Sequence, residues 1–99
     1  MIKLNQLRLN KSGQIYLPNF IRNKMKLVPG DNLFIYRENQ DIILSKEGCL
    51  TENQCILSSN GTLHIPNEIR KMTNIKSSVV FNVSVQENEY KLILSPKMA

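Results

Sequence analysis

Cationic side chains are the residues of this 99-residue chain best suited to do chemistry, and they gather near its N-terminus. The first 26 residues hold six Lys or Arg side chains and no Asp or Glu; the cations are Lys3, Arg8, Lys11, Arg22, Lys24 and Lys26. A surface that serves only solubility normally mixes the two signs. The one-signed stretch therefore favours a polyanionic partner. A modest basic excess also occurs in proteins that bind no nucleic acid, so charge alone leaves both classes open.

The sequence has few residues that could bind a metal ion or catalyse a reaction. Cys49, Cys55 and His64 are the complete set of soft metal ligands, which excludes a four-ligand structural zinc site within one chain. The sequence has no nucleophile elbow, no phosphate-cradling glycine loop and no paired-carboxylate motif. We therefore expect no enzyme, no cofactor and no metal site. A disulfide between Cys49 and Cys55 is conceivable, but a reducing cytoplasm favours free thiols.

The length and the apolar pattern restrict the class of protein. Ninety-nine residues suffice for one compact domain that buries about 65% of its extended surface. The longest apolar runs span three or four residues, far below the roughly twenty needed to cross a bilayer. A secretory signal peptide also needs a longer apolar centre. We expect a cytoplasmic protein with no membrane partner.

The two halves of the chain repeat each other when the sequence is shifted by 48 residues. The string G-x-x-x-x-P-N-x-I-R begins at Gly13 and again at Gly61. Such a repeat decides the architecture, and each half is too short to bury a core by itself. The halves are therefore expected to fold together. We assign residues 1–47 to the first repeat, 48–54 to a connector and 55–99 to the second repeat.

Each repeat is predicted to form two strands, a short helix and two more strands. In the first repeat, apolar residues alternate on either side of a turn at Gly13, and Pro18 ends the second strand because it cannot donate to a ladder. Asn19 is placed to cap the helix. Strands around Leu33–Ile35 and Ile42–Leu44 follow. The residues expected on the buried face of the helix, spaced i, i+4 and i+7, are Ile21, Met25 and Val28.

The second repeat follows the same plan. Asn67 is expected to cap its helix, whose buried face carries Ile69 and Met72. The turn after this helix reads Ser77-Ser78 where the first repeat has a Pro-Gly pair, so it must be made differently. The sum is a mainly β protein with eight short strands and two helices of one to two turns.

The turn glycine, the alternating aliphatics that end in proline, the helix start x-x-Ile-Arg and the Pro-Gly-Asp turn together resemble the AbrB/MazE/SpoVT family of swapped-hairpin DNA-binding domains. The resemblance covers Leu7–Lys46 and again Cys55–Lys97. In that family two units normally come from two subunits, whose hairpins exchange to form one barrel. The resemblance implies a swapped-hairpin β-barrel built from two ββαββ repeats, in a tandem form similar to the two-repeat MraZ proteins. The Val28–Asp31 turn also resembles that of related barrels that do not bind DNA.

The resemblance implies a transcriptional regulator that binds double-stranded DNA through a basic face. Arg22 and Arg70 match the helix arginine of the family, and Arg8 occupies a position that is often basic. The family usually carries Asp-x-x-Gly-Arg at the turn, and both turn arginines are absent here. Lys11 is the available substitute in the first repeat, and nothing basic replaces the arginine in the second.

Guanidinium groups can fork onto a phosphate or onto the O6 and N7 atoms of guanine, whereas ammonium groups fix position on the backbone. A structural alternative for Arg22 and Arg70 is to brace their helices against a carboxylate of the other repeat. Tyr16 and His64 occupy matched outward positions, where base stacking or a phosphate hydrogen bond competes with plain exposure to solvent. The predicted DNA-binding residues are Arg8, Lys11, Arg22, Lys24, Lys26, Arg70 and Lys71.

The net charge of +5 is divided unevenly between the repeats. Residues 1–48 carry eight cations and four acids, whereas residues 49–99 carry five cations and four acids. We therefore expect residues 1–26 to make the stronger contact with DNA.

Two other functions remain open from the sequence. Some members of the family are antitoxins whose barrel binds operator DNA while a flexible tail wraps a toxin, but only Ser95–Ala99 follows the last expected strand. A barrel that mediates protein association alone is the second. The chain can close its barrel as a monomer, exchange hairpins with another copy or stack into a ring, so self-association is an open expectation. A DNA-binding role would place the protein at the nucleoid.

Overall fold

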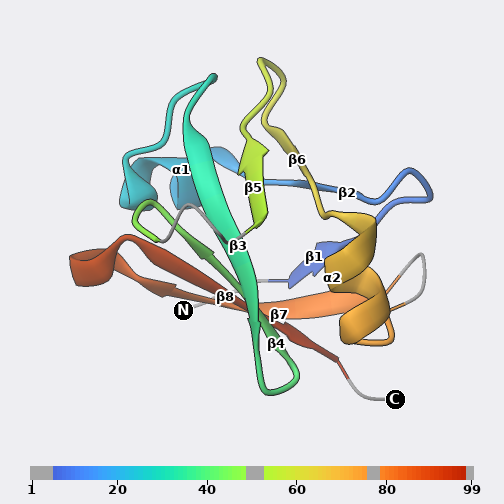
Figure 1. Ribbon diagram of the computed structural model, residues 1–99. Coiled ribbons are helices and arrows are strands. Elements are labelled where there is room, and N and C mark those ends of the chain that lie inside the picture. The colour runs from blue at the N-terminus through green and yellow to red at the C-terminus, as the bar shows by residue number, and fades with distance from the viewer. Residues whose placement is uncertain (1–5, 49–52, 76–78, 98–99) are drawn as a thin grey trace.

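The computed structural model describes residues 6–48, 53–75 and 79–97, and it is mainly β with two short helices (Figure 1). The predicted order of elements is confirmed. The helices are α1 (Asn19–Met25), α2 (Asn67–Met72) and a 3₁₀ turn, η1 (Glu87–Glu89). The strands are β1 (Gln6–Arg8), β2 (Gln14–Tyr16), β3 (Asn32–Glu38), β4 (Asp41–Ser45), β5 (Asn53–Ile56), β6 (Thr62–His64), β7 (Val80–Gln86) and β8 (Lys91–Pro96).

Both helices begin directly after a proline, and neither is capped by a side chain. Pro18 and Pro66 hold the N-cap positions with φ −62° and −56°, and no side-chain hydrogen bond caps either helix. The predicted capping roles of Asn19 and Asn67 are therefore wrong, because each asparagine is already the first helical residue. Each proline has an extended ψ, 158° at Pro18 and 145° at Pro66, so it lies just outside the helix, and the asparagine that follows it is the first helical residue.

The helices are shorter than their apolar patterns suggested. Lys26 takes a left-handed conformation with φ 54° and ends α1, so Val28 lies beyond the helix with 59% of its surface exposed. Leu27 is buried instead. Met72 is the last residue of α2 and is 49% exposed, while Thr73 behind it is buried. The predictions that Val28 and Met72 belong to the core are therefore wrong, because α1 ends before Val28, and at the end of α2 the chain buries Thr73 in place of Met72.

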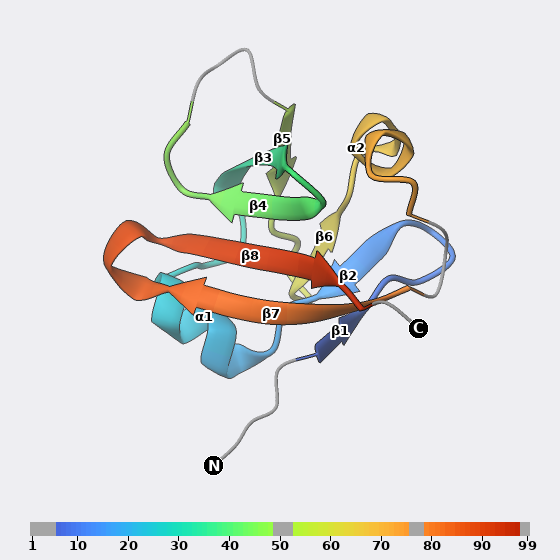
Figure 2. The same cartoon turned by 90° about the horizontal axis from the view of Figure 1, so that it is seen from below.

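The strands exchange between the two repeats. They form a six-stranded antiparallel sheet in the order β1-β7-β8-β4-β3-β5 and a separate two-stranded sheet, β2-β6. The first strand of each repeat thus pairs with the third strand of the other, β1 with β7 and β5 with β3. Figures 1 and 2 show the two sheets facing one another, with the helices at either side. The result is a barrel-like arrangement in which one chain supplies both exchanging hairpins.

The two crossings have equivalent registers. Leu7 faces Phe81 in the β1-β7 pair, and Cys55 faces Leu33 in the β5-β3 pair, which is the same pairing after the 48-residue shift. The strand order also reads the same from either end when each strand is replaced by its counterpart. The chain therefore has an internal pseudo-twofold arrangement. Strand β5 begins at Asn53, inside the 48–54 segment assigned to the connector.

The core lies between the two sheets and draws on both repeats. It includes Leu9 and Leu57 near the turns, Ile15 and Leu63 from the two-stranded sheet and Phe81 from β7, all at most 1% exposed. Because every element contributes to one cluster, neither repeat keeps a separate core. Among the described residues no helix is long and apolar enough to cross a membrane.

Cys55 is a free thiol inside this core. Burial raises its pKa to about 12, because the apolar surroundings disfavour the thiolate. Cys49, the other half of the conceivable disulfide, and the Ser77-Ser78 turn lie outside the described residues.

The facing pair at the centre of the two-stranded sheet should be critical for stability. Replacing fully buried Leu63 by Ala should lower the free energy of unfolding by about 2–5 kcal/mol, from lost transfer energy and the cavity left behind. Chemical denaturation with circular dichroism measures it. Ile56→Ala, at a 63% exposed site, is the control and should change stability by less than about 1 kcal/mol. Equal effects of the two variants would contradict this view of the core.

Candidate nucleic-acid interface

Strands β2 and β6 form a short ribbon whose two faces differ in character. Their central residues, Ile15 and Leu63, face each other and are buried. The alternate residues point outward and are exposed or half-buried; they are Gln14, Tyr16, Thr62 and His64. The ribbon therefore presents a polar, uncharged surface, and α1 and α2 lie on opposite sides of it (Figures 1 and 2). Tyr16 and His64 do point outward as expected.

Each helix arginine lies against the turn glycine of the other repeat. A Cβ added at Gly13 would come within 2.9 Å of Cζ of Arg70, and one added at Gly61 would come within 3.3 Å of Cζ of Arg22. Both glycines also have positive φ, +83° and +85°. Glycine is thus required twice over, for the turn conformation and for the close approach of a guanidinium group. The motif G-x-x-x-x-P-N-x-I-R brings these groups together only because the hairpins cross.

The arginines brace backbone carbonyl groups of their own repeats. Nε of Arg22 donates to the carbonyl oxygen of Leu17 at 2.9 Å, and Nε of Arg70 donates to that of Ile65 at 3.1 Å. In the described part of the chain, neither guanidinium pairs with a carboxylate. The alternative of a carboxylate brace is therefore wrong, and the brace is a carbonyl group. Each half-buried guanidinium keeps N–H groups for a further acceptor.

Tyr16 distinguishes the two arginines. The ring centre of Tyr16 lies 5.7 Å from Cζ of Arg22, and its hydroxyl oxygen accepts from Nη2 at 3.3 Å. The counterpart of Tyr16 in the second repeat is His64. The two ends of the ribbon thus share a framework but differ in the side chain that flanks the arginine.

The remaining predicted cations lie at both ends of the ribbon. Lys11 lies in the turn that contains Gly13, so it belongs to the end that carries α2, Arg70 and Lys71. Arg8 lies on β1, opposite Val80 of β7. The opposite end carries Arg22 and Lys24 on α1 together with Lys26. The hairpin exchange therefore divides the cationic stretch of residues 1–26, of which Lys3 lies outside the described residues. The expectation that residues 1–26 make the stronger contact with DNA stays a prediction, and the structure shows that their described cations are not gathered at one place.

A further cation, Lys46, was missed by the sequence analysis. Its Nζ donates to the carbonyl oxygen of Lys26 at 2.9 Å and lies 5.4 Å from the ring centre of Tyr90. Nζ of Lys26 lies 5.9 Å from the same ring. The sequence offers no signal for this cluster, because its members come from the end of α1, the end of β4 and the start of β8.

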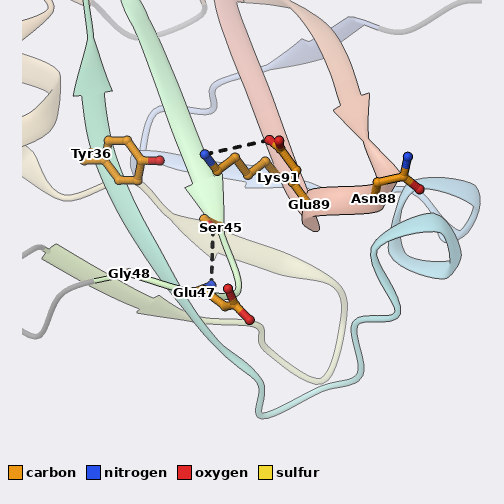
Figure 3. A pocket seen from close by; sticks show the side chains of 7 residues that line it. All are labelled: Tyr36, Ser45, Glu47, Gly48, Asn88, Glu89 and Lys91. Atoms are coloured by element: carbon orange, nitrogen blue, oxygen red, sulfur yellow. Dashed lines mark hydrogen bonds and ion pairs between the residues drawn. The ribbon is translucent and has the colours of Figure 1, made fainter.

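An open pocket elsewhere on the surface does not present catalytic geometry (Figure 3). Glu89 is paired with Lys91 at 3.9 Å. The hydroxyl of Ser45 is fully buried and accepts the N–H of Glu47 at 3.2 Å, so it is not aligned with a base as a nucleophile would be. Among the described residues no group of three His, Cys, Asp or Glu is placed to hold a metal ion. The lining residues are Tyr36, Ser45, Glu47, Gly48, Asn88, Glu89 and Lys91.

Comparison with known families decides the class of the first repeat. Residues 6–48 match the family described as antidote-toxin recognition MazE, bacterial antitoxin. This segment belongs to the AbrB/MazE-type swapped-hairpin family. The MazE-type segment spans a little under half of the chain, from β1 to the residues that follow β4. No curated protein and no solved structure matches the chain. The family is a non-enzymatic kind, and its swapped hairpins agree with the observed strand exchange.

The contact between glycine and arginine can be tested in the MazE-type turn. Gly13→Ala should destabilise the protein by about 1–2 kcal/mol for the left-handed backbone, plus the cost of displacing Arg70. Gly30→Ala is the matched control, because Gly30 has φ +95° but nothing described lies within 4 Å of its added Cβ. Thermal unfolding of both variants, each repeated with Arg70→Ala, isolates the contact. The excess loss at Gly13 should disappear when Arg70 is shortened, and its persistence would contradict the contact.

Proposed function

We propose that this protein is a DNA-binding transcriptional regulator of the AbrB-like type. The observation that carries the proposal is the β2-β6 ribbon, which is polar, free of acids and bordered by Arg22 and Arg70. The major groove of B-DNA admits a two-stranded β-ribbon. Neither arginine is neutralised by a described carboxylate, so both can receive a phosphate or a guanine edge. The proposed site of action is the nucleoid.

The ribbon supplies the groups needed to read bases. The amide of Gln14 can accept from the N6 amino group of adenine and donate to its N7 atom, and the hydroxyl of Thr62 can donate or accept. Tyr16 and His64 add one ring at each end of the ribbon, for stacking or for hydrogen bonding. Because Ile15 and Leu63 anchor the strands from below, these side chains stand on a rigid support. Rigid presentation reduces the conformational entropy lost on binding.

The cations at the two ends supply affinity by releasing counterions from the phosphates. If four to six phosphates are neutralised, the logarithm of the association constant should fall with the logarithm of the salt concentration at a slope of roughly −4 to −5. The lysines at the ends are exposed and fit backbone contacts, while the arginines next to the ribbon are half-buried and fit a single geometry. The proposed DNA-binding set is Arg8, Lys11, Arg22, Lys24, Lys26, Arg70 and Lys71.

Replacing Lys11 tests the role of the turn. Lys11→Ser introduces the residue of the matching turn, Ser59, and should weaken DNA binding while making the salt slope shallower by about one. Selection from a random duplex pool followed by fluorescence titration at several salt concentrations measures both. The double variant Lys91→Ser with Glu89→Ser is the control, because it removes a cation together with the acid that pairs with it, and it should leave the slope unchanged. Failure of the native protein to select or bind any duplex would overturn the proposed function.

The antitoxin role is the second candidate, and the description of the matched family favours it. The apolar side chains of Ile56 and Met72 are 63% and 49% exposed, which gives a protein partner something to contact. Under this alternative the protein should co-purify with one small partner from its native host, and Ile56→Ser with Met72→Ser should release that partner. Native purification followed by mass spectrometry provides the measurement. Purification without a partner, together with specific DNA binding, would favour the regulator.

A further inference from the structure

We propose that Lys26 and Lys46, placed around the ring of Tyr90, bind a phosphate group. The inference rests on the proposed function for its source, which is the DNA backbone beside the α1 end of the ribbon. None of the sequence motifs points to this cluster, because its three residues come from separate elements that only the fold brings together.

The fold fixes the cluster through backbone contacts. The N–H of Lys46 donates to the carbonyl oxygen of Tyr90 at 3.2 Å, which joins the end of β4 to the start of β8. Nζ of Lys46 then donates to the carbonyl oxygen of Lys26 at 2.9 Å, which joins both strands to the end of α1. One N–H of the ammonium group is used in this way, so two remain for a ligand. The site is therefore held in place before any ligand arrives.

The charges of the cluster fit an anion. Two ammonium groups lie 5.4 and 5.9 Å from one ring centre, and the ring attracts both cations. Within the described ranges no carboxylate forms an ion pair with either lysine. Two acids are close in sequence: Glu89 is engaged by Lys91, and exposed Glu47 follows Lys46 without pairing with it. Two cations around one ring make a local positive potential, which attracts an anion. A phosphate group supplies the charge and the acceptor oxygens that this arrangement lacks.

Lys26 has a backbone conformation that is unfavourable for lysine. Lys26 has φ 54°, and its counterpart in the second repeat, Asn74, has φ 56°. Asparagine tolerates this left-handed conformation better than lysine does. At this position the first repeat has lysine, which disfavours the left-handed conformation, whereas the second repeat has asparagine, which tolerates it. Backbone strain of this kind concentrates at functional sites.

The cluster also supplies positive charge at the α1 end of the ribbon, where the turn carries none. At the α2 end, the exchanged turn brings Lys11. At the α1 end, the corresponding turn residue is Ser59, which carries no charge. Lys46, beside Lys26, therefore supplies a cation at the end whose turn has none. The two ends engage phosphates through different elements, a turn at one end and a helix end with a strand end at the other.

Substitution of both lysines tests the site in DNA binding. Lys26→Asn introduces the counterpart residue and keeps the backbone conformation, and Lys46→Gln keeps a donor for the carbonyl oxygen of Lys26. Each variant should make the salt slope shallower by about one, and the double variant by about two. The control is the double variant Lys91→Gln with Glu89→Gln, which removes a lysine without releasing the acid that it engages, and it should leave the slope as it is. Circular dichroism confirms that each variant is folded, and an unchanged slope in a folded double variant would overturn the site.

Titration with inorganic phosphate separates this inference from the proposed function. In NMR spectra of the native protein without DNA, phosphate should shift the signals of Lys26, Lys46 and Tyr90, and the double variant should lose these shifts. Phosphate shifts without any DNA binding would uphold the phosphate site and overturn DNA as its source. A slope change without phosphate shifts would uphold the site for the DNA backbone alone. DNA binding with neither effect would overturn the site and leave the proposed function standing.

Discussion

The exchange of hairpins between the two repeats is the constraint on which the structure depends. Strand β1 completes the sheet of the second repeat and β5 completes that of the first, while β2 and β6 pair with each other. Each repeat alone would leave β3 or β7 unpaired on one side and apolar residues exposed, and the exchange pairs these two strands and buries those residues. Ile15 and Leu63 face each other where the halves meet, so the same pairing buries the core and presents the ribbon.

The exchange of hairpins explains why the two repeats share the same spacing between the turn glycine and the helix arginine. The turn glycine and the helix arginine of one repeat do not meet each other; the glycine of each repeat meets the helix arginine of the other repeat. The arginine then fixes the carbonyl group at the end of its own second strand, at Leu17 or Ile65. Turn, strand and helix are thus held in one geometry on both sides of the ribbon. The groups that stabilise the fold are also those nearest to the proposed DNA, so their substitution changes stability and binding together.

The pseudo-twofold framework carries different side chains at its two ends. Arg8 and Lys11 have the uncharged counterparts Ile56 and Ser59, and Lys26 has the counterpart Asn74. Because the hairpins cross, the turn with its cations joins the helix of the second repeat, and the uncharged turn joins the helix of the first. The positive charge is concentrated in the first repeat of the sequence, but in the fold it is divided between the two ends of the ribbon. A protein with two similar but unequal ends suits a duplex site whose halves differ.

The sequence by itself determined the repeat, the mainly β architecture and the identity of most core residues, because alternation and turn chemistry act over a few neighbouring residues. It failed where the outcome depends on how far a short helix continues, as at Val28 and Met72. Only the tertiary structure decided which cations lie together, since Lys26, Lys46 and Tyr90 are joined by contacts between distant strands and a helix end. The local sequence pattern specifies the helices and strands. Which side chains share a surface depends instead on the long-range strand pairing that brings these elements side by side.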